Sequence, residues 1–157
     1  MALEFSPEAL KKFHDIVARY PKKDAAMLPV LYLAQEQFGY VSEDAIAYVA
    51  RLMDQSPARV RGVVTFYTML NTKPVGRHHI QICRTLSCAL AGAENITRFI
   101  TTNLGIPPGE TTPDGRFTLS EVECLASCGT APMMQVNDDY YEGLTEKKVG
   151  EILESLK

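Results

Sequence analysis

The sequence lacks a run of apolar residues long enough to cross a lipid bilayer, which takes about 20. Its longest apolar run, from Ala25 to Ala34, is about half that length and contains Pro29. The first residues show neither a basic start nor an apolar core followed by small residues, as a secretory leader would. We therefore expect a chain without a membrane span or an export signal, in a reducing compartment.

An excess of positive charge is also lacking. The 157 residues carry a formal net charge of −3 at pH 7, and no basic stripe follows any expected helix. Because nucleic-acid binding requires cations that neutralise phosphates, we expect no nucleic-acid partner. Apolar residues make up 46% and charged residues 22% of the chain, which is typical of a globular protein and excludes a disordered or fibrous one.

The sequence contains neither a glycine-rich dinucleotide fingerprint nor a nucleophile paired with a base. We therefore expect no catalytic residue in this chain. The residues with the clearest chemical potential are its four cysteines, all in the second half.

The first seventy residues have apolar positions every three or four residues, which predicts a bundle of helices. The expected helices start at Ser6, near Asp24 or Leu28, at Ser42 and at Ser56. The buried face of the first helix is expected to hold Leu10, Phe13, Val17 and Tyr20. Pro21 ends this helix, and Gly39 is placed to end the second.

The composition changes at residues 71–76, a polar stretch with proline and glycine that suits neither a helix nor a strand. We place a domain boundary there, between residues 1–74 and 75–157. Apolar alternation then predicts strands over 80–83, 116–122 and 133–136, with a short return through 140–141. Helices are expected over 96–104 and after Thr145, which gives a mixed α and β second domain.

The cysteines form two pairs, Cys83-x4-Cys88 and Cys124-x3-Cys128, separated by 35 residues. Each pair follows an expected strand, so both pairs can emerge as loops at one edge of a sheet. Such short spacings let one loop direct two sulfurs inward, as four-thiolate metal sites require. Alternatives are buried core cysteines, disulfides and a structural zinc site, and the spacing alone does not separate zinc from an iron-sulfur cluster.

The residues around the cysteines favour iron. A [2Fe-2S] cluster with four thiolates carries a net charge of about −2 to −3, so its surroundings must supply N–H donors. No acidic residue lies between paired cysteines, and small residues leave the backbone amides accessible: Ala89, Ala91, Gly92, Ala126, Ser127, Gly129 and Ala131. His78 and His79 precede the first expected strand and are interpreted as surface residues and not ligands.

The sequence from Glu123 to Thr145 resembles the [2Fe-2S] subunit of respiratory complex I, the 24 kDa or E chain of NADH:quinone oxidoreductase. The segment Cys83-Arg-Thr-Leu-Ser-Cys88 is similar to the first ligand loop of that family. Two shorter matches are Thr111-Thr-Pro-Asp-Gly and Val64-Thr-Phe-Tyr. The resemblance covers nearly the whole chain.

This resemblance implies an α+β or α/β fold, in which a helical bundle precedes a thioredoxin-like ferredoxin domain with a small mixed sheet. It implies one [2Fe-2S] cluster, with one iron at Cys83 and Cys88 and the other at Cys124 and Cys128. Its partners would be the flavoprotein subunit that carries FMN and the NADH site, and other subunits of a peripheral arm on the cytoplasmic side of the inner membrane. The activity implied is one-electron transfer; the equivalent subunit of an NAD-linked hydrogenase or formate dehydrogenase is the alternative.

Three further expectations follow from the resemblance. Many relatives have glycine at the position of Ala126, which alanine can replace unless the backbone there has a positive φ. Pro132 precedes a strand, as the cis-proline of thioredoxin-like folds does. The helical half is expected to dock on the flavoprotein, because it adds apolar stripes and no ligands.

Overall fold

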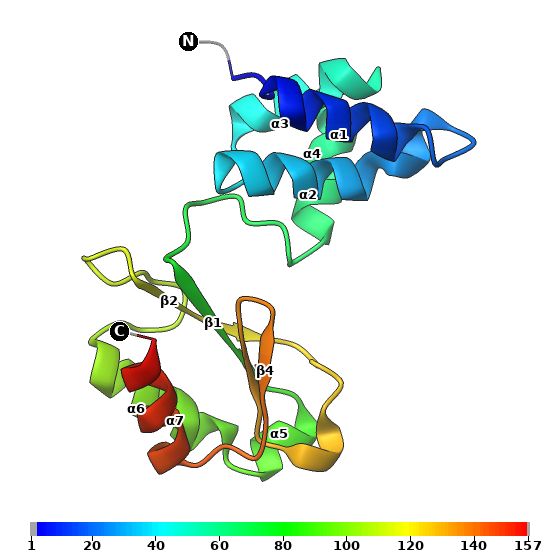
Figure 1. Cartoon of the computed structure of the whole chain (residues 1–157). Helices are drawn as coiled ribbons and strands as arrows, with labels where there is room; N and C mark the ends of the chain where they lie inside the picture. Colours follow the sequence, from blue (N-terminus) through cyan, green and yellow to red (C-terminus); the bar gives the residue numbers. More distant parts are fainter. Residues whose placement is uncertain (1–2, 157) are drawn as a thin grey trace. The chain divides into compact units, whose positions relative to one another are not determined.

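A computed structural model describes residues 3–156 of the chain. The chain divides at the Pro74–Val75 bond into two compact units, and each unit has a hydrophobic core of its own (Figure 1). The first unit is helical and the second combines helices with a mixed sheet, so the predicted fold class is confirmed. Within the part of the chain described, no helix has the length and apolar character that a bilayer crossing requires.

The first unit contains four α-helices and one short 3-10 turn. Their bounds are α1 Pro7–Val17, η1 Lys23–Ala26, α2 Met27–Phe38, α3 Glu43–Met53 and α4 Pro57–Phe66. The predicted serine caps are present: the hydroxyls of Ser6, Ser42 and Ser56 each accept a hydrogen bond from the backbone N–H three residues later. Gly39 ends α2 with a φ of 81°, as its position predicts.

The buried face of α1 differs from the predicted one. Phe13 is buried as expected, but Leu10 and Tyr20 are exposed, and Ala9 takes the inward position instead. The helix ends at Val17, before Pro21, so the helical spacing does not extend to Tyr20. The prediction is wrong at Leu10 and Tyr20, and Ala9 was missed because its small side chain is a weak apolar signal next to Leu10.

Aromatic side chains join the N-terminal segment to the helices of the first unit. The ring of Phe5 lies 5.1 Å from that of Tyr48, edge to face, and 5.6 Å from that of Phe38. The Tyr48 hydroxyl also accepts a hydrogen bond from Phe5 N at 2.9 Å. Phe5 is therefore part of the packed core of this unit.

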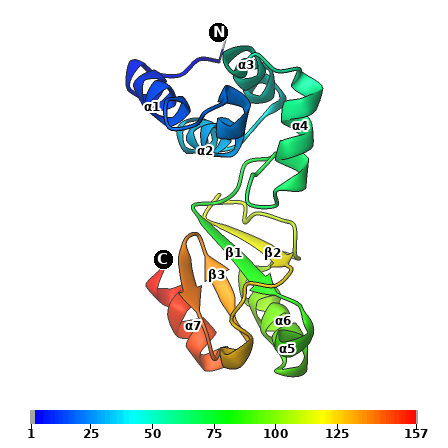
Figure 2. The same cartoon turned by 90° about the vertical axis from the view of Figure 1, so that its right-hand side faces the viewer.

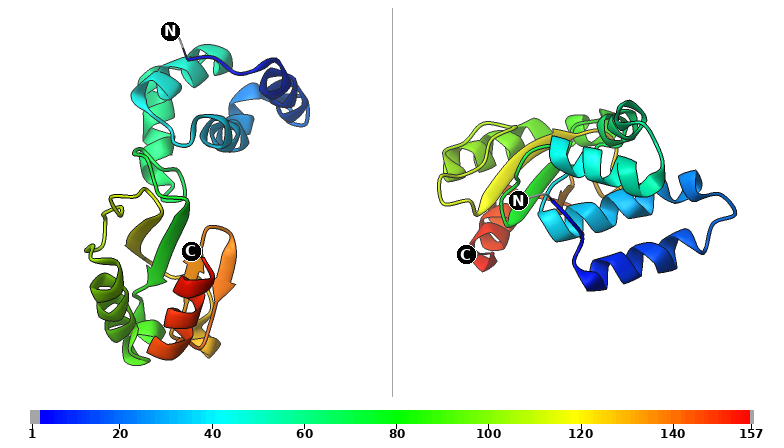
Figure 3. Two further views of the ribbon diagram at one scale, coloured as in Figure 1. Left: turned by 60° about the vertical axis from the view of Figure 1, so that its left-hand side comes forward. Right: turned by 90° about the horizontal axis from the view of Figure 1, so that it is seen from above.

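The second unit is built on a four-stranded sheet with the order β2-β1-β3-β4. The strands are β1 His78–Cys83, β2 Phe117–Val122, β3 Met134–Val136 and β4 Asp139–Tyr141. Strands β1 and β2 are parallel, whereas β3 is antiparallel to both β1 and β4. Figures 2 and 3 show this sheet from other directions.

Three helices complete the second unit: α5 Leu86–Leu90, α6 Ala93–Leu104 and α7 Glu146–Ser155. Helices α6 and α7 contact each other and pack on the sheet (Figure 1). Ile96 and Ile100 of α6 and Val149 and Leu153 of α7 are buried in the same core as the central strand. Both helices lie where the sequence predicts them, whereas α5 was not predicted as a separate helix.

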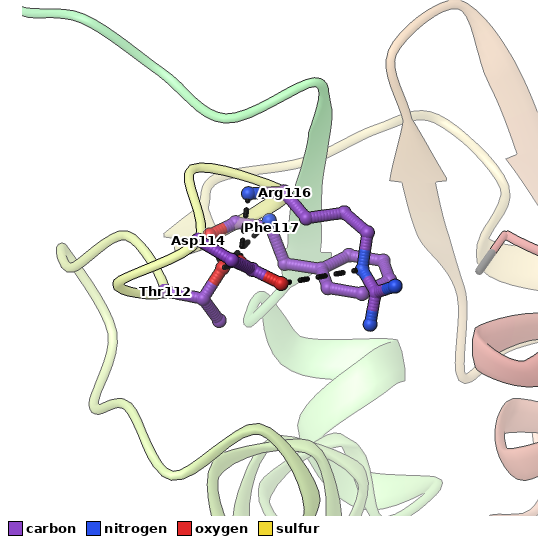
Figure 4. Close-up of polar contacts among 4 residues, drawn as sticks. All are labelled: Thr112, Asp114, Arg116 and Phe117. Carbon is purple, nitrogen blue, oxygen red and sulfur yellow. Dashed lines mark hydrogen bonds and ion pairs between the residues drawn. The ribbon is translucent and has the colours of Figure 1, made fainter.

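A tight turn at Thr112 leads into β2. Gly115 N donates to the Thr112 carbonyl at 2.8 Å. The Thr112 hydroxyl accepts from Phe117 N at 3.0 Å (Figure 4). Hydrogen bonds from the Thr112 hydroxyl and from Arg116 N lower the pKa of the Asp114 carboxyl. The Arg116 guanidinium lies over the Phe117 ring, 5.0 Å from its centroid. The turn thus fixes where β2 begins.

We predict that Gly76→Ala destabilises the second unit. A Cβ at Gly76 would lie 2.8 Å from the Phe117 carbonyl carbon and 2.9 Å from the Arg116 carbonyl oxygen, and both are backbone atoms that cannot rotate away. We expect the free energy of unfolding to fall by about 1–3 kcal/mol, measured by hydrogen exchange of the β1 amides.

The matched control is Gly62→Ala in α4, where an added Cβ meets no atom within 4 Å. Alanine favours the helix there, so this variant is expected to gain about 0.5–1 kcal/mol in urea unfolding. A Gly76→Ala protein with unchanged exchange would show that the strands can move apart at this point.

Candidate metal centre

The parallel pairing of β1 and β2 brings the two cysteine segments to one end of the sheet. Cys83, the last residue of β1, is the register partner of Val122, the last residue of β2, and Cys124 follows two positions later. Arg84 N donates to the Val122 carbonyl at 3.0 Å, and the Arg84 guanidinium pairs with Glu123 at 2.6 Å. The ends of the two strands are therefore hydrogen-bonded to each other immediately before the two cysteine segments begin.

The second cysteine of each pair lies in a short helical segment, where the sequence predicted a loop. Cys88 is in α5, and Cys128 begins the 3-10 turn η2, Cys128–Thr130. Helix α5 contacts η2 at one end of the sheet (Figures 1 and 2). Cys83 and Cys88 are buried and Cys124 and Cys128 are exposed, so the site has a buried side and an exposed side.

Hydrogen bonds surround the sulfur of Cys83. Burial alone raises the pKa of the Cys83 thiol. Hydrogen bonds to the sulfur from the Thr85 hydroxyl, at 3.3 Å, and from the backbone N–H groups of Leu125 and Thr85 outweigh burial, so the pKa is lowered. Leu125 belongs to the second cysteine segment, so its amide reaches across to the sulfur of the first.

The pKa of the Cys88 thiol is raised, first by burial and then by its hydrogen bond with Cys83. The backbone N–H of Met133 donates to the Cys88 sulfur and acts in the opposite direction. The negative charges of Cys83 and Cys128 raise the pKa further. Cysteines of both segments thus contribute to the pKa of Cys88, in agreement with the contact between α5 and η2.

The backbone at Ala126 has a φ of 62°, in the left-handed region. In this conformation Ala126 N donates to the Cys124 sulfur at 3.3 Å. This is the condition under which alanine was not expected to replace glycine without cost, because its Cβ approaches the following carbonyl. The alanine is thus held in a strained conformation that directs an amide at a candidate ligand.

The donor set fits a [2Fe-2S] cluster. The four thiols lie on two segments that leave the same end of the sheet, and the N–H groups of Thr85, Leu125, Ala126 and Met133 are directed at three of the sulfurs. Such donors stabilise the negative charge that a cluster with four thiolates carries. Among the described residues, no three His, Cys, Asp or Glu side chains are grouped as ligands of a metal ion. A two-iron cluster takes two cysteines at each iron.

His78 and His79 lie within β1 and are half-buried, whereas the sequence placed them before the strand and on the surface. The Nε2 atom of His79 lies 2.9 Å from the Ser120 hydroxyl oxygen of β2, and burial lowers the pKa of this histidine. The ring of His78 packs 5.5 Å from that of Phe117. Both histidines therefore contact the neighbouring strand.

Several residues of the site were not predicted as such. Leu125 and Met133 act through their backbone N–H groups, and the type of side chain does not predict where a backbone N–H group points. The peptide bond between Ala131 and Pro132, just before Met133, is cis, as the position of this proline before a strand indicated. Ser127 follows Ala126, and its hydroxyl contacts the Glu142 carboxylate from another part of the chain.

Comparisons with known proteins show the family of this chain. Residues 13–157 match the sequence model of the thioredoxin-like [2Fe-2S] ferredoxin family. The E chain of the NADH-quinone oxidoreductase of Rickettsia conorii is 45% identical over 98% of this chain and 93% of its own. The chain numbered 2 of the NADH-quinone oxidoreductase of Thermus thermophilus is 44% identical over 89% of this chain and 79% of its own.

A solved structure with a similar fold is that of an NAD+-reducing [NiFe]-hydrogenase in the air-oxidized state. The TM-score is 0.73 at 19% identity, and the match covers 83% of this chain and 22% of the hydrogenase chain. At this identity the likeness concerns the fold alone.

We predict that Ala126→Gly stabilises the second unit, because glycine adopts a φ of 62° without the Cβ contact. Removing about 1–2 kcal/mol of strain outweighs the greater freedom of glycine in the unfolded chain, which leaves a gain of about 0.5–1 kcal/mol. Hydrogen exchange of the β1 and β3 amides in the metal-free protein measures it.

Ala89→Gly is the matched control, at an exposed position in α5. The same change is expected to cost about 0.5–1 kcal/mol in a helix. A loss of stability in Ala126→Gly comparable to that in Ala89→Gly would contradict the left-handed conformation at Ala126.

Proposed function

We propose, because the chain belongs to the thioredoxin-like [2Fe-2S] ferredoxin family, that Cys83, Cys88, Cys124 and Cys128 ligate its one [2Fe-2S] cluster. The family predicted from the sequence is confirmed by relatives 44–45% identical over nearly the whole chain. The chain is an electron-transfer subunit of an NADH-quinone oxidoreductase and has a role in catalysis as part of that complex.

The convergence of the two cysteine segments carries this proposal. Strands β1 and β2 end in register at Cys83 and Val122, and helix α5 with Cys88 contacts the turn η2 that Cys128 begins. A hydrogen bond from the Leu125 amide, between Cys124 and Cys128, also lowers the pKa of the Cys83 thiol. As the resemblance implies, one iron is assigned to Cys83 and Cys88 and the other to Cys124 and Cys128. The exposed pair places one side of the cluster close to the surface, where a redox partner can approach.

When bound, the cluster supplies a centre that takes up and releases one electron at a time. The chain sets the conditions for this transfer. Its backbone amides stabilise negative charge on the sulfurs, and burial of Cys83 and Cys88 keeps solvent from one side of the site. Within the family these are the protein's means of adjusting the reduction potential.

We infer that the electron donor is a flavoprotein subunit that carries FMN and the NADH site. The sequence of this chain contains no dinucleotide fingerprint, so the two-electron chemistry of NADH requires another subunit. The curated relatives are subunits of an oxidoreductase, which supports a multi-subunit assembly. The proposed location is the peripheral arm of this assembly, on the cytoplasmic side of the inner membrane, next to the other arm subunits.

The alternative functions differ from the proposed one in metal content or in partner subunits. A hydrogenase or formate dehydrogenase subunit would hold the same cluster and co-purify with different large subunits. The relatives at 44–45% identity are named as NADH-quinone oxidoreductase subunits, which favours that complex. A zinc-binding interaction module would hold one zinc ion and no sulfide.

We predict that the purified chain contains two iron and two acid-labile sulfide, and that Cys124→Ala loses both. The sulfur of Cys124 is a proposed ligand, and the cluster requires all four. The measurements are metal and sulfide analysis, visible absorption, and an EPR signal that appears on reduction.

His79→Gln is the control for mixed ligation, because this half-buried ring contacts Ser120 and is assigned no role at the cluster. It is expected to keep full iron and sulfide content. A normal cluster in Cys124→Ala, or one zinc ion without sulfide in the unaltered chain, would contradict the assignment.

We propose further that the helical unit docks on the flavoprotein. It adds no cysteine, and its surface includes a groove of about 410 Å³ between α1 and α2. Tyr32 and Leu33 line this groove with charged residues of both helices. Phe66, at the end of α4, is 76% exposed. Tyr32 and Phe66 are both exposed and give a partner contact area that the unit's own core does not use.

We predict that a chain shortened to residues 75–157 keeps the cluster and loses most of its affinity for the flavoprotein. The second unit has its own core, and all four cysteines lie in it. A pull-down with the flavoprotein, together with iron analysis of the captured chain, measures both properties. Equal capture of the full and shortened chains would contradict a docking role for the helical unit.

A further inference from the structure

The chain that follows β4 runs beside the turn that carries Cys128. Gly143 N donates to the Thr130 carbonyl at 2.7 Å, and Leu144 N donates to the Pro132 carbonyl at 2.9 Å. Thr130 is the last residue of η2, which Cys128 begins. The turn with a proposed ligand is therefore held from outside by a segment distant in sequence.

Glu142 adds a side-chain contact to these backbone hydrogen bonds. Its Oε1 atom accepts a hydrogen bond from the hydroxyl of Ser127, and this hydroxyl oxygen also lies 2.6 Å from Thr130 Oγ1. The Nζ atom of Lys148 donates to the Glu142 carbonyl oxygen at 2.5 Å. The backbone of Glu142 is thus held by α7, and its carboxylate is held by the turn that carries Cys128.

The carboxylate of Glu142 forms no ion pair among residues 3–156, since Lys148 contacts its carbonyl oxygen instead. Its negative charge is therefore not paired directly. The Ser127 hydroxyl that it holds belongs to the residue directly before Cys128. Hydrogen bonds to a charged acceptor are stronger than those between neutral groups, so this contact is suited to fix a turn that is otherwise exposed.

We propose that Glu142 is a positioning residue for Cys128, with the Ser127 hydroxyl as its point of attachment. The carboxylate fixes the backbone that presents the Cys128 sulfur, and its charge opposes the gain of an electron at the site and so lowers the reduction potential. This inference rests on the proposed ligation of the cluster by the four cysteines. It assigns to β4 and the segment after it a role in holding the exposed half of the site.

Three variants of the full chain test the proposal: Glu142→Ala, Ser127→Ala and Glu142→Gln. Loss of visible absorption in the presence of a chelator measures how firmly the turn holds the cluster. We expect loss about fivefold faster in Glu142→Ala and Ser127→Ala, because each removes one partner of the hydrogen bond. Glu142→Gln keeps an acceptor oxygen but not the charge, so it is expected to lose the cluster at a rate between those of the unaltered chain and Glu142→Ala.

The reduction potential separates the charge from the hydrogen bond. A redox titration followed by EPR is expected to give a higher potential for Glu142→Gln, which removes the charge and keeps the contact. Glu146→Gln is the matched control, since it removes an exposed carboxylate in the first turn of α7. It is expected to change neither the rate of cluster loss nor the potential.

Two results would overturn the positioning role and leave the ligation standing. One is an unaltered chain with two iron and two sulfide whose Glu142→Ala variant matches it in rate and potential. The other is cluster loss as fast in Glu142→Gln as in Glu142→Ala. An unaltered chain without iron and sulfide would overturn the proposed function, and the role of Glu142 with it.

Discussion

The parallel hydrogen bonding of β1 with β2 is the constraint on which the candidate site depends. Its register pairs Cys83 with Val122, so both strands end together and release their cysteine segments at the same end of the sheet. If this register shifted by one position, the starts of the two segments would move apart by the rise of one strand residue, about 3.3 Å. The turn at Thr112 and the close approach of Gly76 to β2 fix where the pairing begins.

The second requirement that the structure meets is to stabilise negative charge at the site. A cluster with four thiolates is anionic, and the described residues around it provide backbone amides and hydroxyls as donors. The backbone N–H groups of Leu125, Ala126 and Met133 are each directed at a cysteine sulfur. At Ala126 the strained backbone sets this direction. The Arg84–Glu123 pair nearby is exposed on both sides, so it contributes little to stability beyond joining the strand ends.

The two units divide the work of the chain. All four cysteines lie in the second unit, and the first contributes helices with a separate aromatic and aliphatic core. Because each core is closed by its own residues, the proposed ligand geometry does not depend on the helical unit. This separation suits a subunit that must keep one cluster in place and bind other subunits through further surfaces.

The sequence by itself determined the family, the mixed fold class, the helix caps at Ser42 and Ser56 and most of the strands. These features depend on local patterns: the spacing of apolar residues, the residues at helix ends and the short intervals between cysteines. The buried face of α1 was predicted wrongly because Ala9, a small residue, takes the inward position that the spacing assigned to Leu10.

Only the tertiary structure decided which groups reach the sulfurs. The amides of Leu125 and Met133, the positive φ of Ala126 and the contact between Ser127 and Glu142 depend on how distant segments pack. The physical reason is that a backbone N–H group is present at nearly every residue. Its direction is set by the φ and ψ angles that long-range packing imposes, and the side-chain sequence does not encode that direction locally.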